Sequence, residues 1–188
     1  MFEDEEGRLW IGTNDNGVSI YVRDKISNIL TVQNDLASNS IRCIAEDEQG
    51  NYYIGTSDAL SIVTISNGLK VRKTLQEIMY ARSIAIGKAG DVAVVNNSGQ
   101  LFIINNQMIK ETFTLKTGNA ETFYTCCKYM DNGDLLVGTT TNEMYRLRKT
   151  NGKYRTIKRY TTGNLQQISS IASDDQGNYW VCSGSGIG

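Results

Sequence analysis

Short runs of alternating apolar and polar residues follow one another along the chain, separated by turns rich in glycine, asparagine and aspartate. Residues 44–56 show the pattern most clearly. An apolar run ends at Ala45, an acidic turn closes at Gly50, and a second apolar run begins at Tyr52. Such runs are typical of β-strands, and glycine at the last turn position accepts a positive φ at little cost. The segment therefore predicts two strands joined by a tight turn.

This strand–turn–strand unit occurs five times, and one turn glycine aligns the copies. These anchor glycines are Gly7, Gly50, Gly90, Gly133 and Gly177. Their separations are 43, 40, 43 and 44 residues. A period of 40 to 50 residues made only of strands and turns is typical of β-propeller blades with four strands each. An isolated match would indicate only a hairpin, whereas five in near-constant register indicate a repeat protein.

We therefore predict an all-β fold, a β-propeller with four-stranded antiparallel blades and an incomplete ring, formed as a single partial propeller over residues 1–188. The predicted blades are residues 2–37, 38–80, 81–121, 122–166 and 167–188. The first lacks most of its inner strand and takes residues 29–32 as a short fourth strand. The last is half a blade, with strands at 168–173 and 178–182. The third and fourth depart from the pattern, for instance with Ala93 in place of an aromatic residue.

A large apolar residue follows each anchor glycine by three positions in four of the copies. These residues are Trp10, Tyr53, Leu136 and Trp180. Because one blade cannot bury both of its faces, we expect these side chains to fill the seams between blades. Core packing is the preferred interpretation of both tryptophans, ahead of a ligand platform. Truncating such an indole should cost about 3–5 kcal/mol.

Composition adds mainly exclusions. The net charge of −1 does not favour general binding to nucleic acid or to an anionic membrane. No apolar run approaches the roughly 18 residues of a membrane-spanning helix, so we expect no direct membrane contact. The first residues are acidic and already belong to the first repeat, so no signal peptide is expected in this chain. That expectation carries little information about cellular location.

The chain has no histidine, which removes the commonest general base and excludes Ser–His and Cys–His catalysis. We predict a protein that is not an enzyme and uses no cofactor, although the missing histidine excludes only these two kinds of catalysis. The four cysteines are Cys43, Cys126, Cys127 and Cys182. Cys43 and Cys126 both lie seven residues before an anchor glycine, which favours small, free thiols in buried strand positions over a disulfide. No pair has metal-binding spacing, so no metal site is predicted.

Candidate ligand residues lie where loops between outer and inner strands approach loops between second and third strands. These loops include residues 14–16, 57–58, 76–80, 96–98, 120–124 and 140–142, which are rich in amides, hydroxyls and carboxylates. Such groups suit sugar hydroxyls, and they equally suit plain solvated turns. Arg42 and Arg82 hold equivalent positions and either face an anionic ligand or pair with carboxylates. The candidate ligand-binding residues are Asn14, Asp15, Arg42, Arg82, Asn97 and Tyr124.

The motif Glu-Asp-x-x-Gly-x-(Leu/Tyr)-(Trp/Tyr)-Ile-Gly-Thr, at residues 3–13 and 46–56, resembles the two-component regulator propeller repeat. Residues 173–181 are similar, and residues 35–42 resemble the family's link between blades. The resemblance implies an extracytoplasmic, periplasmic or cell-surface sensor region of a bacterial membrane-bound regulator, which binds a small-molecule or oligosaccharide ligand. Family propellers have about seven blades. The chain is therefore a fragment, or closes a small ring, or shares a ring with a second copy as a homodimer.

Two other function classes stay open. A protein-interaction scaffold resembling WD-repeat propellers is one, although the Gly-His and Trp-Asp pairs typical of that class are missing. A carbohydrate-active propeller enzyme is the other. It would need paired carboxylates such as Asp174 and Asp175 at a pocket, whereas these two fall in a blade turn.

Overall fold

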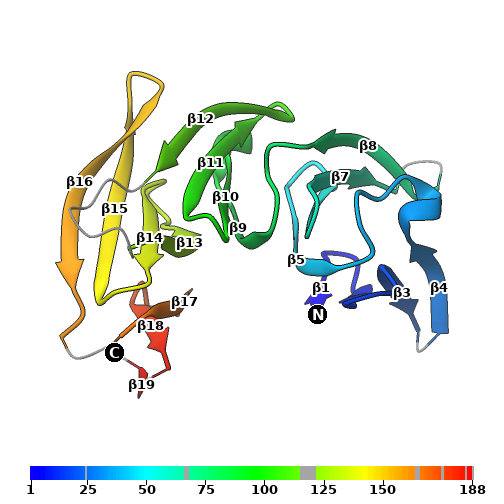
Figure 1. Cartoon of the computed structure of the whole chain (residues 1–188), viewed down its shortest axis with the longest axis horizontal. Coiled ribbons are helices and arrows are strands. Elements are labelled where there is room, and N and C mark those ends of the chain that lie inside the picture. Colours follow the sequence, from blue (N-terminus) through cyan, green and yellow to red (C-terminus); the bar gives the residue numbers. More distant parts are fainter. Residues whose placement is uncertain are drawn as a thin grey trace. The chain divides into compact units, whose positions relative to one another are not determined.

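The structure, a computed structural model, describes residues 1–23, 25–65, 68–114, 122–163, 166–174, 176–184 and 186–187. These residues form an all-β fold of antiparallel sheets in series, each made from consecutive strands (Figure 1). The sheet of the first repeat contains β1 (Phe2–Glu3), β2 (Leu9–Gly12), β3 (Val18–Val22) and β4 (Lys25–Leu30). That of the second contains β5 (Ile41–Glu46), β6 (Asn51–Thr56), β7 (Leu60–Thr64) and β8 (Lys70–Leu75).

The remaining sheets follow the same order. The third contains β9 (Ala81–Ile86), β10 (Val92–Asn96), β11 (Gln100–Asn105) and β12 (Met108–Thr114). The fourth contains β13 (Tyr124–Tyr129), β14 (Leu135–Thr139), β15 (Glu143–Thr150) and β16 (Lys153–Thr161). The fifth contains β17 (Ile168–Ser173), β18 (Tyr179–Ser183) and β19 (Gly186–Ile187). The four-stranded antiparallel blades predicted from the repeat are confirmed.

The chain divides into two compact units, Met1–Ile84 and Ala85–Gly188, with the boundary inside β9. Three details differ from the sequence-based prediction. The fourth strand of the first sheet is β4, ending at Leu30, and a 3₁₀ helix, η1 (Val32–Asn34), follows it where the strand was expected. Thr31 caps this helix and accepts from the Gln33 amide, which favours a turn there over a strand. The last sheet has a third short strand, β19, beyond the two expected.

Each anchor glycine closes the turn between the first two strands of its sheet with a positive φ, between 72° and 84°. At Gly7 and Gly50 a Cβ atom would meet nothing within 4 Å. The requirement for glycine at these two turns is therefore one of backbone conformation and not of space.

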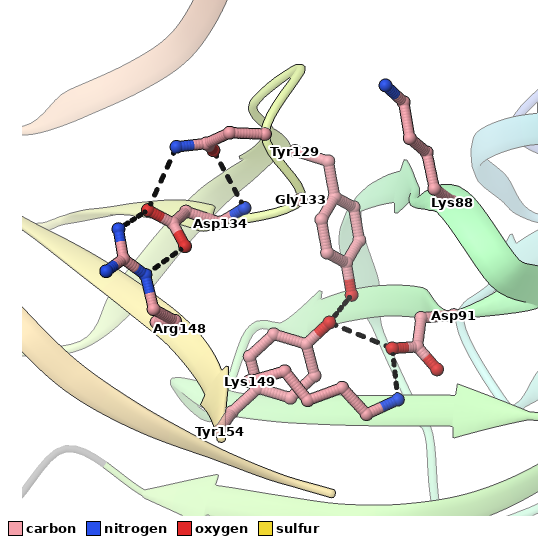
Figure 2. Close-up of a pocket in the computed structure, with 9 residues that line it drawn as sticks. Lys88, Asp91, Tyr129, Gly133, Asp134, Arg148, Lys149 and Tyr154 are labelled. Atoms are coloured by element: carbon pink, nitrogen blue, oxygen red, sulfur yellow. Dashed lines mark hydrogen bonds and ion pairs between the residues drawn. The ribbon is translucent and has the colours of Figure 1, made fainter. Parts of the chain in front are cut away.

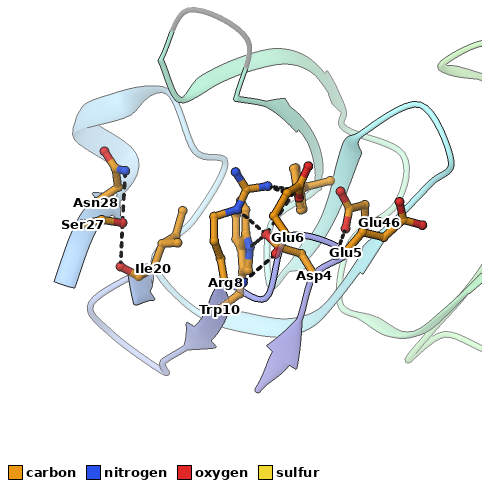
Figure 3. A network of polar contacts seen from close by, with 10 residues as sticks. Asp4, Glu5, Glu6, Arg8, Trp10, Ile20, Ser27, Asn28 and Glu46 are labelled. Carbon is orange, nitrogen blue, oxygen red and sulfur yellow. Dashed lines mark hydrogen bonds and ion pairs between the residues drawn. The ribbon is translucent and has the colours of Figure 1, made fainter. Parts of the chain in front are cut away.

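The acid three residues before the anchor glycine organises the turn in the first, second and fifth copies. The Asp4 carboxylate accepts from the Arg8 amide at 2.7 Å and from the Trp10 indole Nε1 at 2.7 Å (Figure 3). Asp47 and Asp174 repeat this arrangement. Each accepts from the backbone amide four residues later and from the aromatic side chain six residues later, which is Tyr53 at 3.1 Å or Trp180 at 3.1 Å. The Glu-Asp-x-x-Gly motif is thus a turn held by its own carboxylate.

Aromatic and apolar residues pack between neighbouring sheets within each unit. Trp10 is fully buried, and its ring stacks on Tyr52 of the next sheet with centroids 4.1 Å apart and planes at 21°. Leu136 is buried in a cluster that Tyr179 of the following sheet packs against. In both pairs the two packing residues hold the same places in the repeat. One lies three positions after an anchor glycine, and the other lies two positions after the anchor glycine of the next sheet. The seam predicted from the repeat is confirmed for Trp10 and Leu136, and Tyr53 is also buried.

Trp180 differs, because 49% of its surface is exposed. The five copies contain no later residue at the covering position, so the ring keeps its bond to Asp174 but lacks the stacking that buries Trp10. The prediction of a buried Trp180 is therefore wrong in this structure.

The glycine of the Gly-Thr pair that ends each motif has a separate steric role. A Cβ at Gly55 would lie 2.5 Å from Cys43 Sγ and 2.7 Å from the Cβ of Ala81, which begins β9 of the next sheet. At Gly138 the same atom would lie 2.6 Å from Ile168. Glycine here allows the first strand of the following sheet to approach closely.

All four cysteines are free thiols, as the repeat positions predicted. Burial raises the pKa of the Cys43 thiol to about 12. Across the described ranges there is no helix with the length and hydropathy needed to span a bilayer.

Candidate functional site

The six residues predicted to bind a ligand lie at one end of the strands in their sheets. Asn14 and Asp15 are exposed in the turn between β2 and β3, and Asn97 is exposed in the turn between β10 and β11. Arg42 and Arg82 are exposed near the starts of β5 and β9. Tyr124 is buried, 5% exposed, so its ring belongs to the core.

The most developed feature of this end within the first unit is Tyr80, in the connection between β8 and β9. Its backbone adopts φ +51°, which is uncommon for an aromatic residue, and 42% of its surface is exposed. The Arg42 guanidinium lies 5.3 Å from the centre of the Tyr80 ring, within cation–π range. The Tyr80 amide donates to the Ser57 carbonyl at 3.1 Å, which ties this connection to the turn between β6 and β7.

Parts of the predicted rim fall outside the described residues. These are residues 120–121 of the loop before Tyr124. Asp175, one of the two carboxylates considered for an enzyme, also lies outside the described residues. Its neighbour Asp174 is bonded within its own turn, and the side chain of Asn178 above all holds the pKa of Asp174 at about 2.

Carboxylates of Asp4, Glu6 and Glu46 gather within 4.8 Å of one another in the first unit. Arg8 forms ion pairs with Asp4 and Glu6, and the Glu5 amide donates to Glu46 (Figure 3). Burial alone would raise the pKa of Asp4, but hydrogen bonds from Trp10 and Arg8 outweigh it and lower that pKa. This cluster serves the turn and the seam, where Arg8 pairs with both Asp4 and Glu6.

A cavity of about 340 Å³ opens in the second unit, at the opposite strand ends from the predicted rim. Its walls are the turn from β9 to β10, the turn from β13 to β14, and the hairpin of β15 and β16. The first contributes Lys88 and Asp91. The second contributes Tyr129, Asn132, Gly133 and Asp134. The hairpin contributes Arg148, Lys149 and Tyr154.

One side of the cavity is a chain of hydrogen bonds that ends on Asp91. Figure 2 shows the Tyr129 and Tyr154 hydroxyls directed at each other, 3.1 Å apart, with the Tyr154 hydroxyl also directed at Asp91 Oδ2 at 2.9 Å. Because ionised Asp91 can only accept, Tyr154 donates to it and Tyr129 donates to Tyr154. Lys149 Nζ donates to the same carboxylate oxygen at 2.6 Å. Burial, followed by the bond with Tyr154, raises the pKa of Tyr129. Burial also raises the pKa of Tyr154, where the bond with Tyr129 opposes the rise and the bond to Asp91 adds to it, so both tyrosines stay protonated.

The other side is a carboxylate held by two guanidinium groups. Arg148 donates from Nε to Asp134 Oδ1 and from Nη2 to Oδ2, both at 2.9 Å, which is a bidentate pair (Figure 2). Arg146 Nε donates to Oδ2 at 2.6 Å. The bond from Arg148, followed by that from Arg146, lowers the pKa of Asp134 to about 2. Asp134 is therefore an anion at neutral pH.

Sequence reasoning missed this cavity because it followed the motif and not the departures from it. In the first, second and fifth copies the residue after the anchor glycine is Arg8, Asn51 or Asn178. In the third and fourth copies it is Asp91 or Asp134, and the acid three positions before the glycine has gone. In these two copies an acid follows the anchor glycine, and the acid three positions before the glycine is missing. This combined change was the sequence signal from which the site could have been predicted.

The comparisons with known proteins agree with the fold. No curated protein matches the chain in sequence. Among solved structures, it is similar to the extracellular domain of a protein assigned as a hybrid two component system of B. thetaiotaomicron. The identity is 20% and the TM-score 0.72, covering 99% of this chain and 26% of that one.

Two further structures share the architecture. The WD40 β-propeller domain of Doa1 has 18% identity and a TM-score of 0.75, covering 99% of this chain and 60% of that one. Virginiamycin B lyase from Staphylococcus aureus has 14% identity and a TM-score of 0.73, covering 100% of this chain and 67% of that one. The fold is thus that of β-propellers. Since one of these neighbours is an enzyme, the fold alone does not decide whether the chain is catalytic.

The chain spans about a quarter of the length of the extracellular domain that it matches. The sequence pattern of the Two component regulator propeller family matches residues 1–15 and 35–58. These ranges contain the first two copies of the motif, with the turn acids Asp4 and Asp47 and the seam residues Trp10 and Tyr53. Over these two ranges the chain is similar to the two-component regulator propeller family, and the blade architecture agrees with that similarity.

Proposed function

We propose that the chain is part of the ligand-sensing propeller of a bacterial signal-transduction regulator, that it acts outside the cytoplasm, and that it binds a carbohydrate-type small ligand without converting it. The observation that carries the proposal is the family match over residues 1–15 and 35–58. The similarity to an extracellular domain assigned to a hybrid two component system supports the location.

The proposed ligand residues lie at the equivalent strand end of each unit, with Asn14, Asp15, Arg42 and Arg82 in the first unit and Asn97 in the second. Exposed amide, carboxylate and guanidinium groups there offer the donors and acceptors that sugar hydroxyls require. In the first unit, the exposed Tyr80 ring adds an apolar face. Its strained backbone supports a functional role, because such conformations cluster at binding sites. Tyr124, being buried, contributes to the framework of this end and not to the contact surface.

The test is a calorimetric titration of the 188-residue chain with a panel of neutral oligosaccharides, with chromatography of each ligand before and after incubation. We expect at least one to bind and to be recovered intact. Tyr80→Ala should weaken that binding by about tenfold, whereas Met79→Ala, at the adjacent exposed residue, should not change it. Recovery of cleaved or rearranged ligand would replace this proposal by a propeller enzyme.

A dimer in which two copies share a ring remains part of the proposal, since unpaired blade edges tend to associate. Light scattering of the purified chain tests it. A mass of twice 20.9 kDa supports the dimer, and a mass of 20.9 kDa at all concentrations refutes it.

A further inference from the structure

The third and fourth anchor turns differ from the other three in where their carboxylate lies. In the first, second and fifth copies the acid precedes the glycine by three residues and accepts bonds from residues four and six positions later. Asp4 also accepts from the Tyr52 hydroxyl of the next sheet at 3.3 Å. In the third and fourth copies that position is Gly87 or Met130. Without an acid there, these turns cannot form the same closed network.

The replacement carboxylates, Asp91 and Asp134, take their partners from elsewhere in the second unit. Asp91 is bonded by Lys149 and Tyr154, which lie 58 and 63 residues further along the chain. Asp134 is bonded by Arg146 and Arg148 of β15. Each of these two aspartates is therefore paired with a basic side chain of β15. The cavity lies between the Asp91–Lys149 pair and the Asp134–Arg148 pair (Figure 2).

The carboxylates of this cavity have most of their acceptor capacity in use, whereas the cations keep donors in reserve. Asp91 accepts bonds on both oxygens, and so does Asp134. Lys149 uses one of its three N–H donors on Asp91, and Arg148 uses two of its five on Asp134. A group entering the cavity therefore meets N–H donors more than oxygen acceptors.

Lys88 is the cation with the weakest attachment. Its side chain is exposed, and its Nζ donates to the Asp131 backbone carbonyl at 2.7 Å. That bond uses one of the three N–H donors, and a carbonyl, unlike a carboxylate, does not neutralise the ammonium charge. Figure 2 shows its ammonium group on the side of the cavity away from the Asp134–Arg148 pair. Three cations and two carboxylates among the lining residues give the cavity a net charge of +1.

We propose that this cavity binds the anionic group of a small molecule, a carboxylate or a sulfate, with Lys88 as its principal charge partner and Arg148 and Lys149 as further donors. The volume of about 340 Å³ lies in the range of small-ligand pockets. Charge-assisted hydrogen bonds to oxyanions are the strong ones available to such side chains. The inference is independent of the proposed ligand end, because it concerns the opposite strand ends and a charged group.

The test uses the complete 188-residue chain and three probes, D-glucuronate, inorganic sulfate and D-glucose, titrated by calorimetry at low and at raised salt. We expect one or both anions to bind, glucose not to bind at this site, and the anion affinity to fall as ionic strength rises. Glucuronate binding tighter than sulfate identifies an acidic sugar as the ligand class. The reverse order identifies a free tetrahedral anion.

The matched variants are Lys88→Met in the cavity and Lys110→Met, an exposed lysine on β12 outside it. We expect the first to weaken anion binding by about tenfold and the second to leave it unchanged. Circular dichroism of both variants checks the fold. Equal affinities in both variants, equal binding of glucose and glucuronate, or no binding of either anion by the folded chain would each overturn the proposal.

Discussion

Trp10 and Trp180 occupy the same place in the repeat and differ in burial, which makes them a matched pair for measuring what the seam contributes. Trp10 has 0% exposed surface and Trp180 has 49%. Both indoles donate to the acid of their own turn, at 2.7 Å and 3.1 Å. The difference between their truncations therefore isolates packing against the next blade from the turn hydrogen bond.

The expected magnitudes follow from these contacts. Replacing a fully buried indole by alanine costs about 3–5 kcal/mol, and the lost stack on Tyr52 contributes about 0.5–1.5 kcal/mol of that. Asp4 keeps its bonds from Arg8, so no unpaired charge is left behind. Trp180 buries only about half of its surface, and we expect Trp180→Ala to cost about 1 kcal/mol. The predicted difference is about 3 kcal/mol, a large share of the free energy of unfolding of an ordinary domain.

Urea unfolding followed by circular dichroism measures both variants. Because the chain divides into two units, the transition must also be followed through the remaining tryptophan, which reports the opposite unit in each variant. Trp10→Phe is the intermediate control, since it keeps a ring in the seam but removes the bond to Asp4. We expect it to cost about 1–2 kcal/mol. Equal losses for the two alanine variants would refute the assignment of the seam as the main source of stability.

Three further predictions concern the second unit and one thiol. Gly138→Ala places a Cβ 2.6 Å from Ile168 and should destabilise the chain by about 1–3 kcal/mol in urea, and an unchanged free energy of unfolding would contradict this close approach. The folded-state pKa of Asp134 is about 2, below its unfolded value, so its pairing with Arg148 stabilises the fold above about pH 4 and is lost as pH falls towards 2. With Arg148 half exposed, the loss should be about 1–2 kcal/mol in acid unfolding, and Asp134→Asn should abolish that part of the pH dependence. Cys43, whose pKa is raised to about 12, should react with a thiol reagent at pH 8 far more slowly than an unfolded control, and equal rates would contradict its placement.

The sequence predicts those parts of the fold in which the strands and turns of one copy contact only each other or the next copy along the chain. The spacing of the anchor glycines predicted the sheets, and the small residue at Cys43 matched the glycine that it faces at position 55. The burial of Trp10 also followed from the repeat. Trp180 did not, because burial depends on a partner that the repeat pattern assigns to the next copy, whether or not that copy is present.

The cavity was unpredictable for a different reason. Asp91 and Asp134 look like ordinary turn acids, and only the fold brings Lys149 and Tyr154 to Asp91 across about 60 residues. A period-based analysis treats the third and fourth copies as weakened versions of the others. In the structure they are stabilised by different partners, and no single copy contains enough of the site to reveal it.

The displaced acids also affect the order in which the blades can fold. Where the acid precedes the anchor glycine, as at Asp47, the bonds that its carboxylate accepts span at most six residues, so the hairpin can close by itself. Asp91 has a nearer partner in Asn105, but its bonds from Lys149 and Tyr154 span 58 and 63 residues and must wait for β15 and β16. Contacts of large sequence separation form late because the loop between them must close first. The residues that make the second unit chemically distinctive therefore also give its assembly a slower step than that of the locally closed turns.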